Sequence, residues 1–151
     1  MYSGLYEPNE TIPTISNAMD VKNPSNFIRI QEIYNNLENT RKHLSSYSFT
    51  DEQTRELMQK VYKNGYTLDP HGAVGYLGLD KYFETNAFTQ ENEAIFLETA
   101  HPVKFLELVE ETLAVKLDLS EELQALMKKE KKAISCSNSF NEFTEVLHSI
   151  L

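Results

Sequence analysis

The chain has 151 residues, 40% of them hydrophobic, and carries 23 acidic against 14 basic residues for a formal net charge of −9. This length suffices for a domain that buries about two-thirds of its unfolded surface. The acidic balance argues against a nucleic-acid partner, because phosphate backbones are bound by clustered Lys and Arg. No apolar run approaches the roughly 18 residues of a membrane span, so no membrane partner is expected. The single cysteine, Cys136, excludes an internal disulfide and is typical of a reducing compartment, which predicts a cytoplasmic protein.

Residues 1–22 have no helical period and are rich in turn formers, so we expect an irregular or extended segment there. We predict one helix-rich α/β unit over residues 23–151. The stretch "TISNAMDV" holds the polar residues Asn17 and Asp20. These residues either form a turn before the first helix or face a site, and the turn is favoured.

Capping residues predict where the helices begin. Asn23 and Pro24 open a helix whose apolar face runs from Phe27 to Leu37. A second helix starts at the capping box of Thr50 and Gln53 and stops at Gly65. Asp69 and Pro70 give a strong start to a third helix.

The third helix carries Gly72, Gly75 and Gly78 at a spacing of three residues. Each glycine in a helix interior costs roughly 1 kcal/mol relative to alanine, so a compensating close approach is expected. The spacing matches neither a dinucleotide fingerprint nor a P-loop. Close packing is favoured for this face, and a ligand face is the alternative.

The stretch "EAIFLETAHPVKF" predicts a short buried strand at residues 94–97, followed by a helix from Pro102. Ligands of open α/β sheets bind beyond the carboxyl ends of strands, where Thr99, His101 and Lys104 would lie. The alternative is that Thr99 and His101 cap the helix and Lys104 is solvated.

Two further helices are predicted near the end of the chain. Ser120 would begin the first, and a capping box of Ser139 and Glu142 would begin the second. The total is about six helices and two to four short strands, which is an α/β class that is mostly helical. A buried strand needs neighbours on both sides. Either the sheet is very small, or its other strands belong to sequence that is not present here.

Three long motifs, "TISNAMDV" with "NPSNF", "GYTLDPHGAVGYLGL" and "IFLETAHPVKFLELVEETL", resemble in order and spacing the C-terminal part of bacterial and fungal threonine synthases. The resemblance implies a fold type II architecture with pyridoxal 5'-phosphate as cofactor. It implies conversion of O-phospho-L-homoserine and water into L-threonine and phosphate. It assigns Thr99, in the T-A-H-P motif, to the nitrogen of the cofactor ring, and it makes Asn17, Asp20 and His71 candidates for facing the site, beside His101 and Lys104.

The family's Schiff-base lysine and its loop for the cofactor phosphate lie upstream and have no counterpart here. The resemblance therefore implies a C-terminal portion of a larger catalytic fold that is inactive alone and contains no catalytic residue of its own. Residues 94–97 would then join a sheet built mostly by upstream sequence. The alternative is a stand-alone binding or regulatory half-enzyme. In either case an exposed apolar face would favour self-association. No metal site is indicated.

Overall fold

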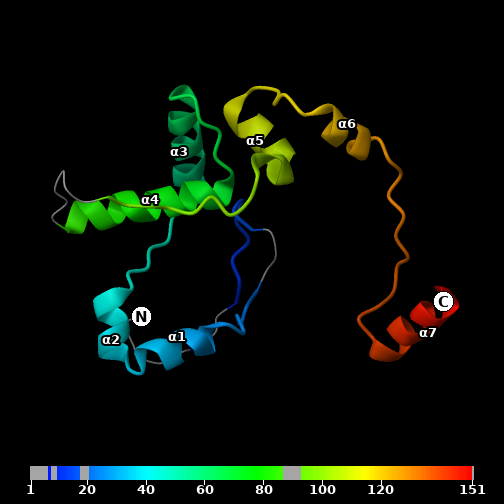
Figure 1. Cartoon of the computed structure of the whole chain (residues 1–151), viewed down its shortest axis with the longest axis horizontal. Coiled ribbons are helices and arrows are strands. Elements are labelled where there is room, and N and C mark those ends of the chain that lie inside the picture. Colours follow the sequence, from blue (N-terminus) through cyan, green and yellow to red (C-terminus); the bar gives the residue numbers. More distant parts are fainter. Residues whose placement is uncertain (1–6, 8–9, 18–20, 87–92, 151) are drawn as a thin grey trace. The chain divides into compact units, whose positions relative to one another are not determined.

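The structure is a computed structural model that describes residues 7, 10–17, 21–86 and 93–150. It divides into two compact units, Met1–Leu117 and Asp118–Leu151. The described residues form seven α-helices and one 3-10 helix (Figure 1). The mostly helical class is thus confirmed, with one α-helix more than expected. The predicted boundary at residue 22 stays a prediction.

The first predicted helix is in fact two, α1 (Phe27–Tyr34) and α2 (Leu37–His43). Asn35 has φ of 63°, in the region that an L residue in a helix does not adopt. The side chain of Asn36 then accepts a hydrogen bond from the backbone N–H of Asn39 at 2.9 Å and caps a new helix. The apolar spacing continues across this break, which is why periodicity alone predicted one helix.

The cap predictions for α3 (Asp51–Lys63) are confirmed. Gln53 N–H donates to Thr50 Oγ1 at 3.2 Å, and Thr50 N–H donates to Gln53 Oε1 at 2.9 Å. This reciprocal pair satisfies two donors that the first helical turn cannot satisfy itself. The chain leaves the helix through Gly65, whose φ of 90° favours glycine.

Helix α4 (Pro70–Thr85) begins as predicted, with Asp69 as its cap. Helix α3 packs against both α4 and α5 (Leu106–Leu113), which follows the 3-10 helix η1 (Pro102–Phe105). The buried apolar side chains that form the core of this unit are Leu57, Met58, Leu68, Ala73 and Val109. This small core holds the start of α4 against the segment that leads into η1.

Two polar contacts join α3 to α5. Arg55 Nη1 donates to Thr112 Oγ1 at 2.6 Å, and Gln59 Nε2 donates to the carbonyl of Thr112 at 2.9 Å. The two donors lie one turn apart on α3, so both can bond the same buried residue, Thr112, near the end of α5.

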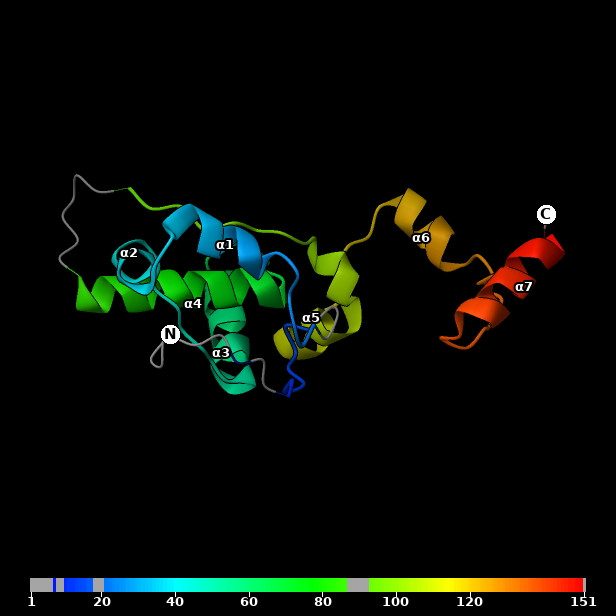
Figure 2. The same cartoon turned by 90° about the horizontal axis from the view of Figure 1, so that it is seen from below.

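The predicted strand at residues 94–97 is wrong as a paired strand. The segment is extended and runs alongside α4 (Figures 1 and 2), but no strand is assigned anywhere in the described ranges. Ile95 and Leu97 are 85% and 74% exposed. A strand exists only when a neighbour bonds its backbone, and the described residues supply no such neighbour.

The second unit contains α6 (Glu121–Met127), which begins where "SEEL" predicts, and α7 (Phe140–Ile150). The predicted capping box at the start of α7 is wrong. Glu142 accepts a hydrogen bond from the backbone N–H of Ser137 at 3.1 Å and also bonds its hydroxyl, so it does not reach back to Ser139. Among the helices described, none has the length and apolar character that crossing a membrane requires.

Candidate functional site

The start of α4 meets the end of the extended segment through two acidic residues. Asp69 N–H donates to Glu98 Oε1 at 3.0 Å, across 29 positions of sequence. The Asp69 side chain is 0% exposed. Its Oδ1 atom accepts from the backbone N–H of His71 at 2.7 Å and lies 2.9 Å from Nδ1 of the His71 ring.

The glycine face of α4 explains how Glu98 fits. A Cβ placed on Gly72 would lie 2.0 Å from Glu98 Oε2, so no other residue could stand there without moving that carboxyl group. A Cβ on Gly75 would lie 4.0 Å from Phe96, which is ordinary contact, and one on Gly78 would meet nothing within 4 Å. The close packing predicted for this face is therefore confirmed at Gly72, where the neighbour is a polar side chain.

The carboxyl groups of this pair differ in acidity. Burial, a hydrogen bond with Asp69 and the charge of Asp69 together raise the pKa of Glu98 to about 7. Burial also acts to raise the pKa of Asp69, but hydrogen bonds from Glu98 and from the His71 backbone and ring outweigh it and hold that pKa below its usual value. Two oxygens, Asp69 Oδ2 and Glu98 Oε2, are buried and accept no hydrogen bond from any described residue.

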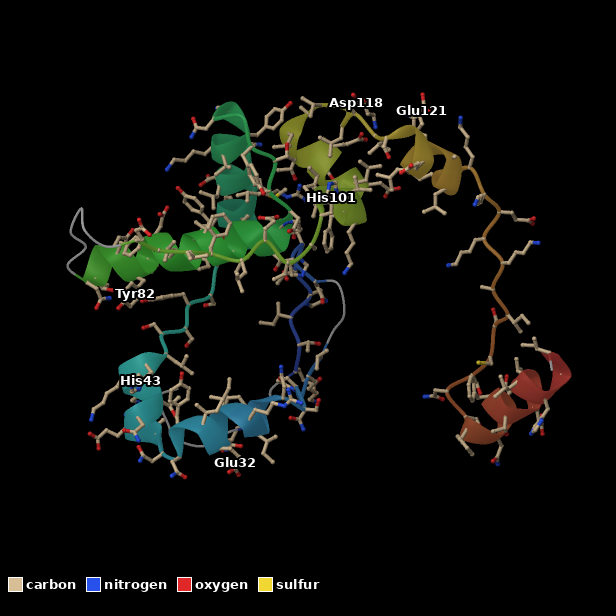
Figure 3. All side chains as sticks on the ribbon, in the orientation of Figure 1. Glu32, His43, Tyr82, His101, Asp118 and Glu121 are labelled. Carbon is tan, nitrogen blue, oxygen red and sulfur yellow. The ribbon has the colours of Figure 1, made fainter. Side chains whose placement is uncertain are left out.

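The residues of the T-A-H-P motif lie directly after this pair. Thr99 is exposed, and within the described part of the chain its hydroxyl has no hydrogen-bond partner. His101 (labelled in Figure 3) caps η1, because its Nδ1 accepts from the N–H of Val103 at 3.2 Å. Lys104 is exposed, with Nζ 5.9 Å from the centroid of the Phe105 ring. The capping alternative thus holds for His101 and not for Thr99.

The other candidates divide between the described and undescribed parts of the chain. His71 is partly buried in the first turn of α4, with its ring centroid 5.0 Å from that of Phe105. Asn17 closes a turn, since its N–H donates to the carbonyl of Thr14 at 3.2 Å. Asp20 lies outside the described residues. Among the described residues, Lys104 has no recorded contact with the acidic pair.

Sequence reasoning missed the partnership of Asp69 and Glu98. Asp69 was correctly predicted as a helix cap, but its contact with Glu98 spans two elements and leaves no local pattern. The glycine at position 72 was the available signal, because a buried neighbour had to approach the helix there.

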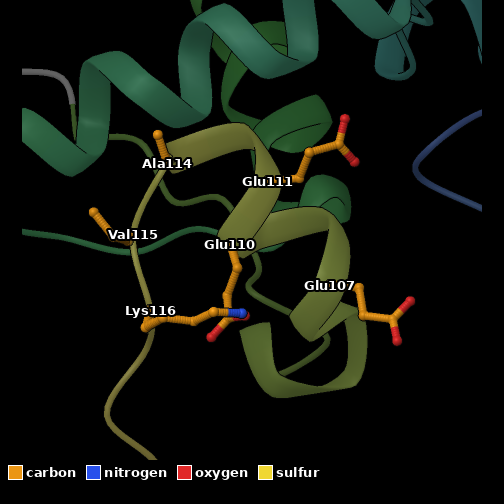
Figure 4. Close-up of a pocket in the computed structure, with 6 residues that line it drawn as sticks. All are labelled: Glu107, Glu110, Glu111, Ala114, Val115 and Lys116. Atoms are coloured by element: carbon orange, nitrogen blue, oxygen red, sulfur yellow. The ribbon is translucent and has the colours of Figure 1, made fainter.

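A hollow of about 720 Å³ lies along the rest of the α4 glycine face and is lined by Gly75, Gly78, Tyr82, Ile95 and Leu97, among others. Another hollow, of about 450 Å³, lies beside α5, and three of its six lining residues are glutamates (Figure 4). In it Glu110 pairs with Lys116. No group of three or more potential metal ligands occurs in the ranges described.

The family model described as "Threonine synthase, C-terminal" matches residues 72–147, which include both the glycine face and the T-A-H-P motif. The chain belongs to the threonine synthase family. The threonine synthase of Buchnera aphidicola subsp. Acyrthosiphon pisum (strain APS) is 38% identical over 122 residues, covering 81% of this chain and 27% of that relative. The threonine synthase of Escherichia coli (strain K12) is 37% identical over 123 residues, covering 82% of this chain and 28% of that relative.

The crystal structure of threonine synthase from Escherichia coli aligns with a TM-score of 0.81 and 31% sequence identity. The alignment covers 99% of this chain and 34% of that one. The chain thus spans about a third or less of the length of the threonine synthases it matches. The resemblance drawn from the motifs is confirmed, as is the assignment to a C-terminal portion of a threonine synthase.

Proposed function

We propose that this chain is the C-terminal part of a threonine synthase that uses pyridoxal 5'-phosphate and converts O-phospho-L-homoserine and water into L-threonine and phosphate. The observation that carries the proposal is the T-A-H-P motif in a threonine synthase family member, which begins with an exposed Thr99 whose hydroxyl no described residue engages. The cofactor would supply an electron sink for the reacting carbon atoms.

The residues present fit such a cofactor. A threonine hydroxyl has one donor and two acceptor positions, so it can donate to the lone pair of a pyridine nitrogen. Unlike a carboxylate, it is neutral and does not hold a proton on that nitrogen by charge. Thr99 would therefore orient the ring without making it strongly electron-poor.

The remaining candidates receive different degrees of support from the structure. His71 has the strongest, because its ring is held on one side by Asp69 and is 29% exposed on the other. His101 uses Nδ1 to cap η1, which leaves Nε2 as its donor. Asn17, Asp20 and Lys104 remain candidates from the motifs alone.

This chain is expected to be inactive by itself, because the lysine that would bind the cofactor covalently belongs to the part of the family's sequence that it does not span. The exposed side chains of Ile95 and Leu97 support the view that the chain is one part of a larger enzyme. They leave apolar surface open on an extended segment, and the larger part of the enzyme would cover that surface. Uncovered, the same surface favours self-association of the isolated chain, and the cytoplasm is the expected location of the whole enzyme.

A chimera tests the proposal. The C-terminal third of the Escherichia coli threonine synthase is replaced by this chain, and phosphate release from O-phospho-L-homoserine is followed together with the absorbance of the cofactor. Thr99→Val removes the hydroxyl at nearly constant shape, and Thr99→Ser retains it. We expect activity and cofactor absorbance in the parent chimera, a loss of at least tenfold in T99V with a shifted absorbance band, and recovery in T99S.

Equal activity in the parent and T99V chimeras would refute the role of Thr99. A folded chimera that binds the cofactor and releases no phosphate would favour the half-enzyme alternative, in which the chain binds a partner without catalysis. The isolated chain is treated with pyridoxal 5'-phosphate and borohydride as a separate test. Its mass should show no adduct specific to one lysine, and a stable adduct would overturn the expected inactivity.

A further inference from the structure

We propose that Asp69 and Glu98 share a single proton and act as a positioning pair, which fixes the His71 ring in the tautomer with hydrogen on Nδ1 and leaves Nε2 as a proton acceptor. The backbone N–H of Asp69 donates to Glu98 Oε1 at 3.0 Å, which brings the two residues together, yet each carboxyl group retains one buried oxygen without a partner among the described residues, Asp69 Oδ2 and Glu98 Oε2. Two ionised carboxylates would leave both oxygens unsatisfied and facing like charge. A single proton turns this repulsion into one hydrogen bond.

The surroundings decide which group holds the proton. Asp69 Oδ1 already accepts two hydrogen bonds from His71, and Asp69 stands at the N-terminus of α4, where a negative charge is favoured. Glu98 accepts only one, from the backbone of Asp69. The proton therefore belongs to Glu98, which shares it with Asp69.

Among the described residues, the titratable side chain that acts on the pair besides its two members is His71, which bonds Asp69. Glu98 Oε2 lies against Gly72, which has no side chain. Within the described part of the chain, no Lys or Arg side chain is recorded as bonding either carboxyl group, so sharing of a proton takes the place of neutralisation by a cation.

The consequence for His71 follows from hydrogen-bond chemistry. An ionised Asp69 can only accept, so the 2.9 Å contact requires hydrogen on His71 Nδ1. The other nitrogen is then unprotonated in the neutral ring, and the ring is held in place by Phe105. An Asp–His pair in this arrangement is suited to accept a proton from, or a hydrogen bond donated by, a bound group.

The test uses the isolated chain and no cofactor, so its failure is distinct from failure of the proposed function. Carbon-13 NMR of labelled carboxyl groups follows Glu98 and Asp69 from pH 4 to 9, and nitrogen-15 NMR identifies the His71 tautomer. Glu107, an exposed glutamate on α5, is the internal control. We expect Glu98 to titrate more than one pH unit above Glu107, and His71 to carry its proton on Nδ1. Titration of Glu98 together with Glu107, or an Nε2–H tautomer, overturns the proposal.

Variants separate positioning from mere packing. Glu98→Gln keeps the shape of the protonated group, so its amide can donate to Asp69 while its carbonyl accepts from the Asp69 N–H. E98Q should retain the His71 tautomer and should remove the pH dependence of the thermal midpoint between pH 5 and 8. Glu107→Gln should leave that dependence unchanged. An E98Q protein with the parent's pH dependence would show that Glu98 does not hold the proton.

Discussion

Replacement of Gly72 by alanine perturbs the site at a single point. The added Cβ would lie 2.0 Å from Glu98 Oε2 and 2.5 Å from its Cδ, far inside van der Waals contact. The end of a glutamate side chain is flexible, so the collision itself is relieved by rotation of Glu98 toward solvent. The cost arises because that rotation breaks the bond from the Asp69 N–H and separates the carboxyl pair.

The size of the effect follows from these losses. Leaving a buried N–H without its acceptor costs about 1–3 kcal/mol. Alanine returns up to about 1 kcal/mol of helix propensity, which offsets part of the loss. Gly78→Ala is the matched control, because its Cβ would meet nothing within 4 Å and it should show only the propensity gain. The free energy of unfolding of G72A should therefore fall below that of G78A by about 1–3 kcal/mol.

The assay is urea unfolding of the chain and both variants, followed by far-ultraviolet circular dichroism at pH 5 and pH 8. At pH 5 the Glu98 carboxyl is protonated and the pair is intact, so the deficit of G72A should be greatest. At pH 8 the ionised Glu98 already weakens the parent, since its pKa lies near 7, and the deficit should shrink. Equal midpoints for G72A and G78A at pH 5 would refute the reasoning, because Glu98 would then not be seated against the helix.

Three further outcomes are expected of the isolated chain. Thr50→Ala removes the hydroxyl of the capping box with Gln53 and should lower the free energy of unfolding by about 1 kcal/mol, as measured by the same urea titration. Met58→Ala leaves a cavity in the core, where the methionine is nearly inaccessible to solvent, and should lower the free energy of unfolding by about 2–5 kcal/mol. Leu126→Ala, at a side chain that is 59% exposed, should change the stability little. Equal effects of the two variants would contradict the assigned core. Folding raises the pKa of Glu98 from its usual value of 4.5 to about 7, so between these pH values the folded state holds a proton that the unfolded state has lost. This contribution to stability should be complete below about pH 4.5 and should disappear as the pH rises through 7, and thermal midpoints measured over this pH range would reveal it.

Local chemistry made several elements predictable. The cap at Asp69 and the capping box at Thr50 depend on residues two or three positions apart, and both are found as expected. The break at Asn35 was missed because the hydrophobic period runs through it, and only the positive φ and the cap at Asn36 reveal it. The capping box predicted for Ser139 and Glu142 does not form, because a second serine, Ser137, lies within reach of Glu142 and bonds it instead.

Contacts between distant segments were not accessible in this way. A run of apolar residues such as 94–97 signals a tendency to extend, but pairing depends on a neighbour that the described residues do not provide. The acidic pair of the candidate site joins positions 69 and 98, and no periodicity links them. Only the glycine at position 72 carried information about that contact, and it indicated that something approaches without indicating what.

The extended segment at residues 93–99 also bears on how copies of such a chain aggregate. Within the described ranges its backbone is assigned to no strand, and Ile95 and Leu97 expose apolar side chains beside that backbone, which is the kind of edge that pairs with identical strands in aggregates. Glu93 and Glu98 place a negative charge near each end of this apolar stretch, and like charges stacked in a growing sheet would repel one another. The segment therefore carries its own partial protection against such pairing.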